Sequence, residues 1–185
     1  LSPLQFGNPD LPQLVMDALS QTGLQPALLE LEVTEGALME NTEATRVALQ
    51  ALRDRGVGIA LDDFGTGYSS LAYLTRMPIG HIKIDRCFVA GLLDGGEGRA
   101  IVRAVLAMAS ALGIRVTAEG VETIEQAQVL KAMACGNLQG FYFSRPVIAG
   151  RIPALRARRW TLGDLDEPRR TPSDAASPGA LSAVR

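Results

Sequence analysis

The sequence predicts an α/β fold with parallel strands: a (β/α)8 TIM-like barrel of which the chain holds about the last five strands. Short apolar segments of strand length alternate with longer segments of helical periodicity. Polar residues stand at or just after the C-terminal end of each strand-length segment. An open sheet draws its site from the few strands beside a switch point, whereas a barrel brings all its strand ends to one rim. Polar ends on five consecutive strands therefore favour the barrel.

The strand-length segments are short apolar runs of the kind that parallel sheets bury on both faces. We expect strands at Leu28–Val33, Val57–Leu61, His81–Ile84, Ile114–Ala118 and Leu138–Phe143. We expect helices at Asp10–Leu19, Thr42–Arg55, Leu71–Arg76, Arg99–Leu112 and Ile124–Ala134. Glycines follow several of these helices, as expected at helix C-termini: Gly23, Gly56 and Gly113.

The composition changes after about Gly150. We expect residues 1–150 to form the domain and residues 151–185, rich in Arg, Pro and Ser, to form a flexible tail. An arginine cluster in this tail is expected to be the solvated end of a helix rather than an anion site: Arg156, Arg158 and Arg159. A full barrel takes roughly 250 residues, so we expect about three further strands before Leu1 and, for the chain as written, an incomplete barrel.

Composition and charge exclude several classes of protein. The 185 residues carry a formal net charge of −2, which argues against a nucleic-acid polymer as partner. No apolar run is long enough to span a membrane, and we expect no signal peptide. We expect a cytoplasmic domain, whose parent protein can still be membrane-anchored elsewhere. Cys87 and Cys135 lack a CxxC pairing and are predicted to be reduced core residues.

The strand ends supply an unusual set of side chains: four carboxylates, one ammonium and one amide. They are Glu32, Asp62, Asp63, Lys83, Glu119 and Gln139. So many acids at one rim repel one another unless a cation neutralises them, and all-oxygen ligation favours Mg²⁺ or Mn²⁺ over zinc. The adjacent acids Asp62 and Asp63 suit a two-metal site. Any one of these residues alone is better explained as a cap or ion pair; six in register predict metal-dependent phosphate chemistry.

Two further features have simpler explanations. The Asp-Phe-Gly within Asp62–Ser70 resembles the magnesium motif of kinases, but no glycine-rich nucleotide loop or HRD-type catalytic loop accompanies it. Gly65 and Gly67 more simply let a loop bend tightly. The single histidine, His81, lies within a predicted strand and is not expected to function.

The order of five motifs resembles the EAL family of cyclic di-GMP phosphodiesterases. The motifs are LELEVTE (Leu29–Glu35), LDDFGTGYSSL (Leu61–Leu71), IKIDRCFV (Ile82–Val89), TAEGVET (Thr117–Thr123) and LQGFYFSRP (Leu138–Pro146). The resemblance implies hydrolysis of cyclic di-GMP to linear pGpG with two Mg²⁺ or Mn²⁺ ions. It also implies a homodimer and, in the parent chain, a possible GGDEF or sensor domain.

The resemblance implies roles for individual residues. The implied metal ligands are Glu32, Asp62, Asp63 and Glu119. Glu119 is also implied to help deprotonate the attacking water, Lys83 to contact that water, and Gln139 to lie at the edge of the metal site. Glu122 is implied to steady a loop that links the metal site to dimerisation: Phe64, Gly65, Thr66, Gly67, Tyr68, Ser69 and Ser70.

Two parts of the family pattern do not occur in this sequence: the Glu-Ala-Leu tripeptide and a metal-binding asparagine expected just before Leu1. From this we expect the chain as written to be inactive and poorly folded, and the parent protein to be an active enzyme. The alternative is a catalytically inactive receptor that binds cyclic di-GMP. A purely structural scaffold has no feature in its favour.

Overall fold

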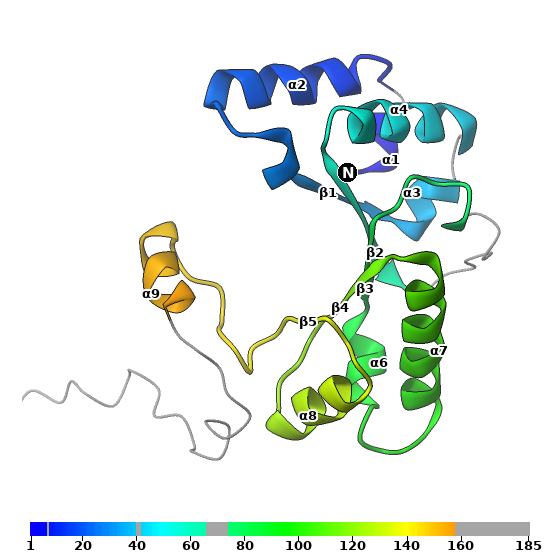
Figure 1. The fold of residues 1–185 in the computed structure, drawn as a ribbon, viewed down its shortest axis with the longest axis vertical. Helices are drawn as coiled ribbons and strands as arrows, with labels where there is room; N and C mark the ends of the chain where they lie inside the picture. Colours follow the sequence, from blue (N-terminus) through cyan, green and yellow to red (C-terminus); the bar gives the residue numbers. More distant parts are fainter. Residues whose placement is uncertain (7, 40–41, 66–73, 158–185) are drawn as a thin grey trace, which may run out of the picture. The chain divides into compact units, whose positions relative to one another are not determined.

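The computed structural model describes residues 1–6, 8–39, 42–65 and 74–157. The chain divides into two units, Leu1–Pro146 and Val147–Arg185. The first unit contains a five-stranded sheet in the order β1-β2-β3-β4-β5 (Figure 1), and every neighbouring pair is parallel. The strands are β1 (Glu30–Thr34), β2 (Gly58–Phe64), β3 (His81–Ile84), β4 (Arg115–Ala118) and β5 (Asn137–Leu138). Each strand lies beside the next one in sequence, as in one sector of a parallel barrel.

Helices precede the first strand and connect the later ones. They are α1 (Pro3–Phe6), α2 (Leu11–Thr22), α3 (Glu35–Met39), α4 (Thr42–Asp54), α6 (Arg86–Ala90), α7 (Glu97–Leu112) and α8 (Ile124–Ala132), with a 3₁₀ turn η1 (Pro26–Leu28) before β1. The chain leaves α2 and α7 through left-handed glycines, Gly23 with φ 67° and Gly113 with φ 68°. A reciprocal capping box between Thr123 and Gln126 begins α8. The predicted helix boundaries at these places are confirmed within a few residues.

The two faces of the sheet differ sharply in chemistry. Side chains alternate between the faces of a strand, and paired residues of parallel strands share a face, so the registers define both sets. One face is apolar: Leu31, Val33, Ile59, Leu61, Ile82, Ile84, Val116, Ala118 and Leu138. The other is polar or small: Glu30, Glu32, Gly58, Ala60, Asp62, His81, Lys83, Arg115, Thr117 and Asn137.

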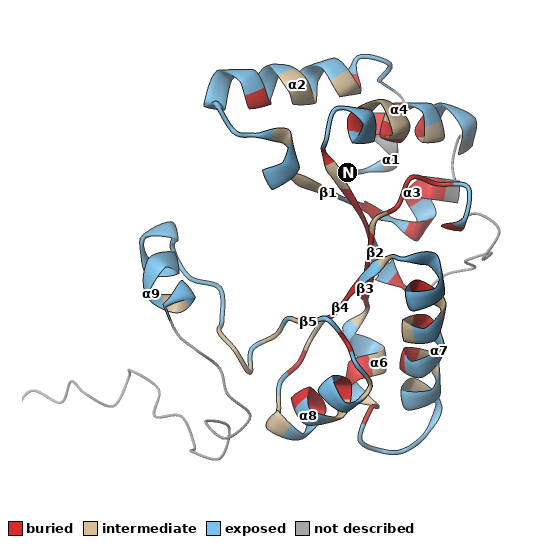
Figure 2. Cartoon of the chain, in the orientation of Figure 1, coloured by how far each residue is buried: buried red, intermediate tan, exposed pale blue. Residues whose placement is uncertain are grey.

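The apolar face of the sheet forms the hydrophobic core together with the helices that pack on it. Most of its residues belong to one buried cluster with Leu49 and Leu52 of α4 and Val102 and Val105 of α7, and Leu31 and Leu138 pack against that cluster partly buried. Helix α4 packs on β2, and α7 packs on β4. In Figure 2 the buried residues follow the strands and the sheet-facing sides of these helices. Each Å² of apolar surface that is buried in this way stabilises the fold by about 25 cal/mol. The polar face is thereby left for chemistry.

The structure corrects several sequence-based expectations. The strand expected over Leu138–Phe143 is wrong beyond Leu138: β5 covers only Asn137–Leu138, because the chain turns at Gly140, where backbone from Val121 leaves no room for a side chain. The short helices α3 and α6 directly after β1 and β3 were not expected. Of the two free cysteines Cys135 is buried, but Cys87, on α6, is exposed and not a core residue.

The second unit has a 3₁₀ turn η2 (Ala149–Arg151) followed by a short helix α9 (Ile152–Arg156). The rest of the expected tail, residues 158–185, lies outside the described residues, and so does the first half of the helix expected over Leu71–Arg76, residues 71–73. The predicted division at residue 150 therefore stays a prediction. Across the described part of the chain, no helix has the length and apolar character that crossing a membrane requires.

Candidate metal and phosphodiester site

The polar face converges on one ammonium group at the C-terminal ends of the strands. Lys83 Nζ lies 2.6 Å from Glu32 Oε1 on β1 and 2.8 Å from Glu119 Oε1 just after β4. It also lies 3.1 Å from Asp62 Oδ1 on β2. We call Glu32, Asp62, Asp63 and Glu119, with Lys83 at their centre, the carboxylate cluster. The sequence predicted that these residues from four strands would meet, and they do.

The environment of Lys83 keeps its amine charged. Its side chain is only 9% exposed, and burial by itself disfavours the charge. The hydrogen bonds to Glu119 and Glu32 and the pairing with Asp62 outweigh burial, and together they raise the pKa of Lys83 above its ordinary value. The cluster therefore holds one fixed positive charge among four carboxylates.

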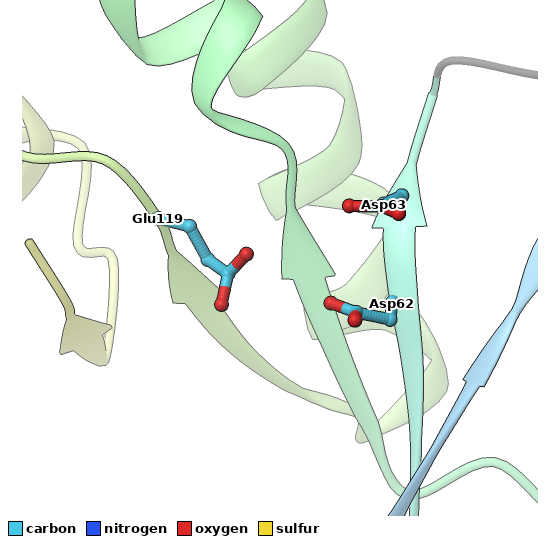
Figure 3. Close-up of side chains that lie close together, drawn as sticks. All are labelled: Asp62, Asp63 and Glu119. Carbon is cyan, nitrogen blue, oxygen red and sulfur yellow. The ribbon is translucent and has the colours of Figure 1, made fainter. Parts of the chain in front are cut away.

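Asp62 and Asp63 are adjacent in sequence, yet both carboxylates face Glu119 (Figure 3). Regular alternation would place one of them on the apolar face. The β2–β3 register is interrupted between Leu61 and Phe64, and Asp63 adopts a left-handed backbone conformation with φ 54°. Aspartate tolerates this conformation better than most residues, at some cost in strain. The irregularity is what brings two neighbouring acids to one site.

Asp63 carries the electrostatic cost of this convergence. Burial, the negative charges of Asp62 and Asp85 and a hydrogen bond with the Asp85 carboxyl together raise the pKa of Asp63, although Lys83 acts in the opposite direction. Like-charged carboxylates in one place disfavour full ionisation. A cation would remove that penalty.

Three carboxylates are close enough to hold one ion. Single oxygens of Asp62, Asp63 and Glu119 lie within 4.8 Å of one another. Asp62 Oδ1 is buried, and among the described residues no donor reaches it with hydrogen-bond geometry, so its contact with Lys83 is an ion pair only. An unsatisfied carboxylate oxygen in an all-oxygen, negatively charged set is the environment that Mg²⁺ and Mn²⁺ prefer. The residues present therefore fit a hard divalent cation.

A cavity of ≈ 600 Å³ opens beside the cluster. It is lined by Asp63, Asp85, Arg86, Glu119, Gly120, Glu122, Gln139, Gly140 and Phe141. The predicted site residues Asp63, Glu119, Glu122 and Gln139 line it, whereas Glu32, Asp62 and Lys83 are not in its lining. A volume of this size suits a small ligand. A ligand in this cavity would lie next to the candidate cation site.

Besides two glycines, sequence reasoning missed three residues of this cavity: Asp85, Arg86 and Phe141. Asp85 follows β3 directly and also caps α6 by accepting a hydrogen bond from Cys87 N at 2.8 Å. The rule that polar residues follow strand ends would have found it. Arg86 packs so closely on Gly120 that an added Cβ would lie 2.4 Å from Arg86 Cβ. Phe141 is 51% exposed at the cavity, and the guanidinium carbon of Arg145 lies 4.7 Å from its ring centroid.

The base of the predicted loop is held from two sides. Gly65 N donates a hydrogen bond to Glu35 Oε1 at 3.0 Å, a contact that sequence reasoning missed although Glu35 ends the LELEVTE motif. Gly65 has φ +100°, and an added Cβ would lie 2.7 Å from the Phe88 ring. Phe64 is buried. The rest of the predicted loop lies outside the described residues: Thr66, Gly67, Tyr68, Ser69 and Ser70. Glu122 is exposed, and its role in holding this loop stays a prediction.

These groups can do specific chemistry together. A carboxylate set with excess negative charge can hold a divalent cation, Lys83 can fix an anionic oxygen or a water, and Glu119 reaches from the cluster into the cavity wall. A cation, a fixed ammonium and a carboxylate base around one cavity are the components that hydrolysis of a phosphate ester uses.

Comparisons with known proteins agree with this geometry. A family model described as EAL domain matches residues 1–146. The cyclic di-GMP phosphodiesterase NbdA of Pseudomonas aeruginosa is 46% identical over 156 residues, which are 84% of this chain and 20% of that protein. Across four curated relatives the chain spans between 19% and 24% of their length.

Solved structures show the same fold. A structure described as PaMucR phosphodiesterase in complex with c-di-GMP, a protein of Pseudomonas aeruginosa, has a TM-score of 0.78 at 45% identity, covering 82% of this chain and 62% of that one. A manganese/cy-diGMP complex of Klebsiella pneumoniae BlrP1 has a TM-score of 0.72 at 41% identity, covering 77% of this chain and 36% of that one. The predicted barrel-type α/β fold is confirmed.

Proposed function

Because this chain belongs to the EAL domain family, we propose that it is the catalytic part of a phosphodiesterase that hydrolyses cyclic di-GMP to linear pGpG. The observation that carries the proposal is the carboxylate cluster around Lys83 beside the cavity. The names of NbdA and MucR support the substrate. All four acids and the lysine that the resemblance requires within these residues are present and close together.

The acids would hold the catalytic cations. Asp62, Asp63 and Glu119 have oxygens close enough for one ion, and Glu32, on the other side of Lys83, is proposed as a further ligand. Divalent cations at such sites lower the pKa of water and stabilise charge on phosphate oxygens. We propose two Mg²⁺ or Mn²⁺ ions; the manganese complex of BlrP1 supports the choice of metal.

The protein's own groups divide the remaining work. Glu119 has one oxygen paired with Lys83, and its other oxygen is proposed to accept the proton of the attacking water. The water oxygen then bonds to phosphorus, the ester bond to the 3′-oxygen breaks, and a proton ends on the released 3′-hydroxyl. Lys83 is proposed to orient that water. Gln139, in the cavity lining, is proposed to stand at the edge of the metal site.

Three finer parts of the proposal concern the whole protein. We propose a homodimer through the loop region Phe64–Ser70, as the resemblance to the EAL family implies. We propose regulation by a further GGDEF or sensor domain, since relatives include a bifunctional diguanylate cyclase/cyclic di-GMP phosphodiesterase and the oxygen sensor DosP of Escherichia coli. We propose a cytoplasmic location for the domain.

The test follows cyclic di-GMP by chromatography with the full-length protein that contains this chain. With Mg²⁺ or Mn²⁺ we expect pGpG as product. Glu119→Ala should lower kcat by at least about 10²–10⁴-fold, the usual worth of a general base. Glu97→Gln, which changes an exposed acid at the start of α7, is the control and should keep the wild-type rate.

The second candidate function is a receptor that binds cyclic di-GMP without hydrolysing it. The presence of Glu32, Asp62, Asp63 and Glu119, the four acids that the resemblance places in this chain, speaks against it. Calorimetry for binding, combined with the chromatographic assay for pGpG, decides between the two functions. A protein that binds cyclic di-GMP yet forms no pGpG with either Mg²⁺ or Mn²⁺ is a receptor.

A further inference from the structure

A second polar group lies on the same sheet face, nearer the N-terminal ends of the strands. His81 is buried, and its two ring nitrogens both have partners: Nδ1 lies 2.7 Å from Glu30 Oε1 and Nε2 lies 2.8 Å from Thr117 Oγ1. Arg115 Nη2 donates to Glu30 Oε2 at 2.7 Å. We call Glu30, His81, Arg115 and Thr117 the lower polar layer.

The contact between Glu30 and His81 passes over an intervening strand. Glu30 is on β1 and His81 on β3, and these strands are not neighbours because β2 lies between them. The residue of β2 in register with Glu30 is Gly58. A Cβ added at Gly58 would lie 3.3 Å from both Cγ and Oε2 of Glu30. The absence of a side chain at Gly58 therefore lets the Glu30 side chain lie across β2 and reach His81.

The carboxylate cluster repeats this arrangement two residues further along the same strands. Glu32 follows Glu30 on β1, Lys83 follows His81 on β3, and residues two apart in a strand share a face. Lys83 Nζ and Glu32 Oε1 are 2.6 Å apart, across β2 at the small residue Ala60, which is in register with Glu32. Two bridges between β1 and β3 are thus stacked, the lower one fixed by a buried imidazole and the upper one part of the site.

We propose that the hydrogen bond between Glu30 and His81 positions β1 against β3, and thereby holds Glu32 and Lys83 in their catalytic arrangement. The inference rests on the proposed function for its catalytic readout. His81 touches no reacting atom, so it is a positioning residue. The bond through Nδ1 does the positioning, because Glu30 is on the other strand of the bridge, whereas Thr117, the partner of Nε2, is on β4 beside β3.

Two conservative substitutions separate the two ring nitrogens. Asparagine places its side-chain amide near the position of Nδ1, and glutamine places it near Nε2. His81→Asn therefore keeps a donor for Glu30, whereas His81→Gln keeps a partner for Thr117. The full-length protein is assayed for kcat, KM, Mn²⁺ affinity and melting temperature. Loss of the positioning contact should lower kcat and Mn²⁺ affinity by about 10–100-fold, as loss of supporting contacts around metal sites does.

We expect His81→Gln to show this loss with KM nearly unchanged, and His81→Asn to retain most of the wild-type kcat and Mn²⁺ affinity. Arg115→Gln is the matched control: it removes the other partner of Glu30, at a side chain that is 63% exposed, and exposed pairs contribute little. It should leave kcat and Mn²⁺ affinity close to the wild type.

Equal losses in His81→Asn and His81→Gln that follow the melting temperature would show a packing role only and overturn the inference. So would a His81→Gln protein with wild-type kcat and Mn²⁺ affinity. A wild type that binds Mn²⁺ but makes no pGpG overturns the proposed function and leaves the Mn²⁺ affinities of the two variants to decide the inference. A wild type that does neither overturns both.

Discussion

The carboxylate cluster and the lower polar layer occupy one face of one sheet, yet they differ in charge balance. In the lower polar layer a single carboxylate, Glu30, meets the guanidinium of Arg115 and the imidazole of His81. In the cluster three of the four carboxylates pair with the one ammonium of Lys83, and the fourth, Asp63, lies beside Asp62 and Glu119. The lower layer is complete with protein groups alone. The cluster is complete only with added positive charge, and this difference marks it as the site of chemistry.

The pKa directions of one acid from each group agree with this contrast. Burial disfavours ionisation of Glu30, but the hydrogen bond from His81 and the charges of His81 and Arg115 outweigh it and lower the pKa of Glu30. For Asp63, burial and the charges of Asp62 and Asp85 together raise the pKa. Paired acids stabilise a fold as anions, whereas crowded acids oppose it.

The largest difference between the two polar groups is expected when the ammonium of Lys83, the cation of the carboxylate cluster, is removed. Lys83→Met should lower kcat by about 10²–10³-fold, the usual cost of losing one preorganised charge-stabilising donor. It should also lower the melting temperature in chelator, because Glu32 and Glu119 lose their shared partner. Excess Mn²⁺ should restore part of that stability. Lys131→Met, at the exposed lysine of α8, is the control; if both variants behave alike in rate and melting, Lys83 has no special role.

Asp63→Asn tests the crowding of acids in the carboxylate cluster through the pH dependence of the melting temperature. A folded-state pKa above the ordinary value of 3.8 means that Asp63 supports folding at pH values below 3.8 and ceases to do so as pH rises through the raised pKa. In chelator the melting temperature of Asp63→Asn should therefore exceed that of the wild type by a margin that grows from about pH 4 to neutral pH.

With Mn²⁺ the order of the two melting temperatures should reverse, because Asp63 is a proposed ligand, and the rate of hydrolysis should fall. Thermal melts of the two proteins across this pH range, with and without metal, measure both effects. A margin that stays constant with pH would contradict the assignment of Asp63 as the crowded acid. Asp94→Asn, outside both groups, controls for the loss of one negative charge.

A smaller effect is expected from a substitution at Gly58, the glycine over which the Glu30 side chain reaches His81. In Gly58→Ala the new Cβ would require Glu30 to shift by a few tenths of an ångström. We expect a loss of a few-fold in kcat, well below the about 100-fold that a 1 Å misplacement costs. Gly80→Ala, where nothing lies within 4 Å of an added Cβ, is the matched control. A Gly58→Ala enzyme as fast as its Gly80→Ala control would mean that Glu30 is not constrained by β2.

The smallest effect is expected at the edge of the cluster. Glu122→Gln changes an exposed residue in the cavity lining, and we expect a fall in kcat smaller than that of Gly58→Ala, through loosening of the predicted loop that begins at Phe64. Glu35→Ala, which removes the observed acceptor of Gly65 N, should cost more. If Glu122→Gln matches the wild type in rate and metal dependence, the loop role of Glu122 is wrong and Glu35 is left as the anchor.

Sequence patterns located the elements well where local signals are strong. The strand His81–Ile84 was predicted to the residue, and α7 ends at the predicted Gly113, because a left-handed glycine stops a helix locally. The short elements escaped: α3 and α6 have five residues each, too few for helical periodicity to show. The two-residue β5 was overestimated because an apolar run does not reveal where strand pairing stops.

The sequence by itself determined that Glu32, Asp62, Lys83 and Glu119 meet, because parallel strands bring their C-terminal ends to one edge. It also carried the five motifs of the EAL domain family. Only the tertiary structure decided that Asp62 and Asp63 face the same way, since a left-handed residue and a register break override alternation. Only it revealed the pairing of His81 with Glu30, because that contact spans 51 residues and depends on a glycine of the strand between them. The local sequence pattern determines the strand and the position at which a side chain stands, but its contacts depend on residues that are distant in sequence.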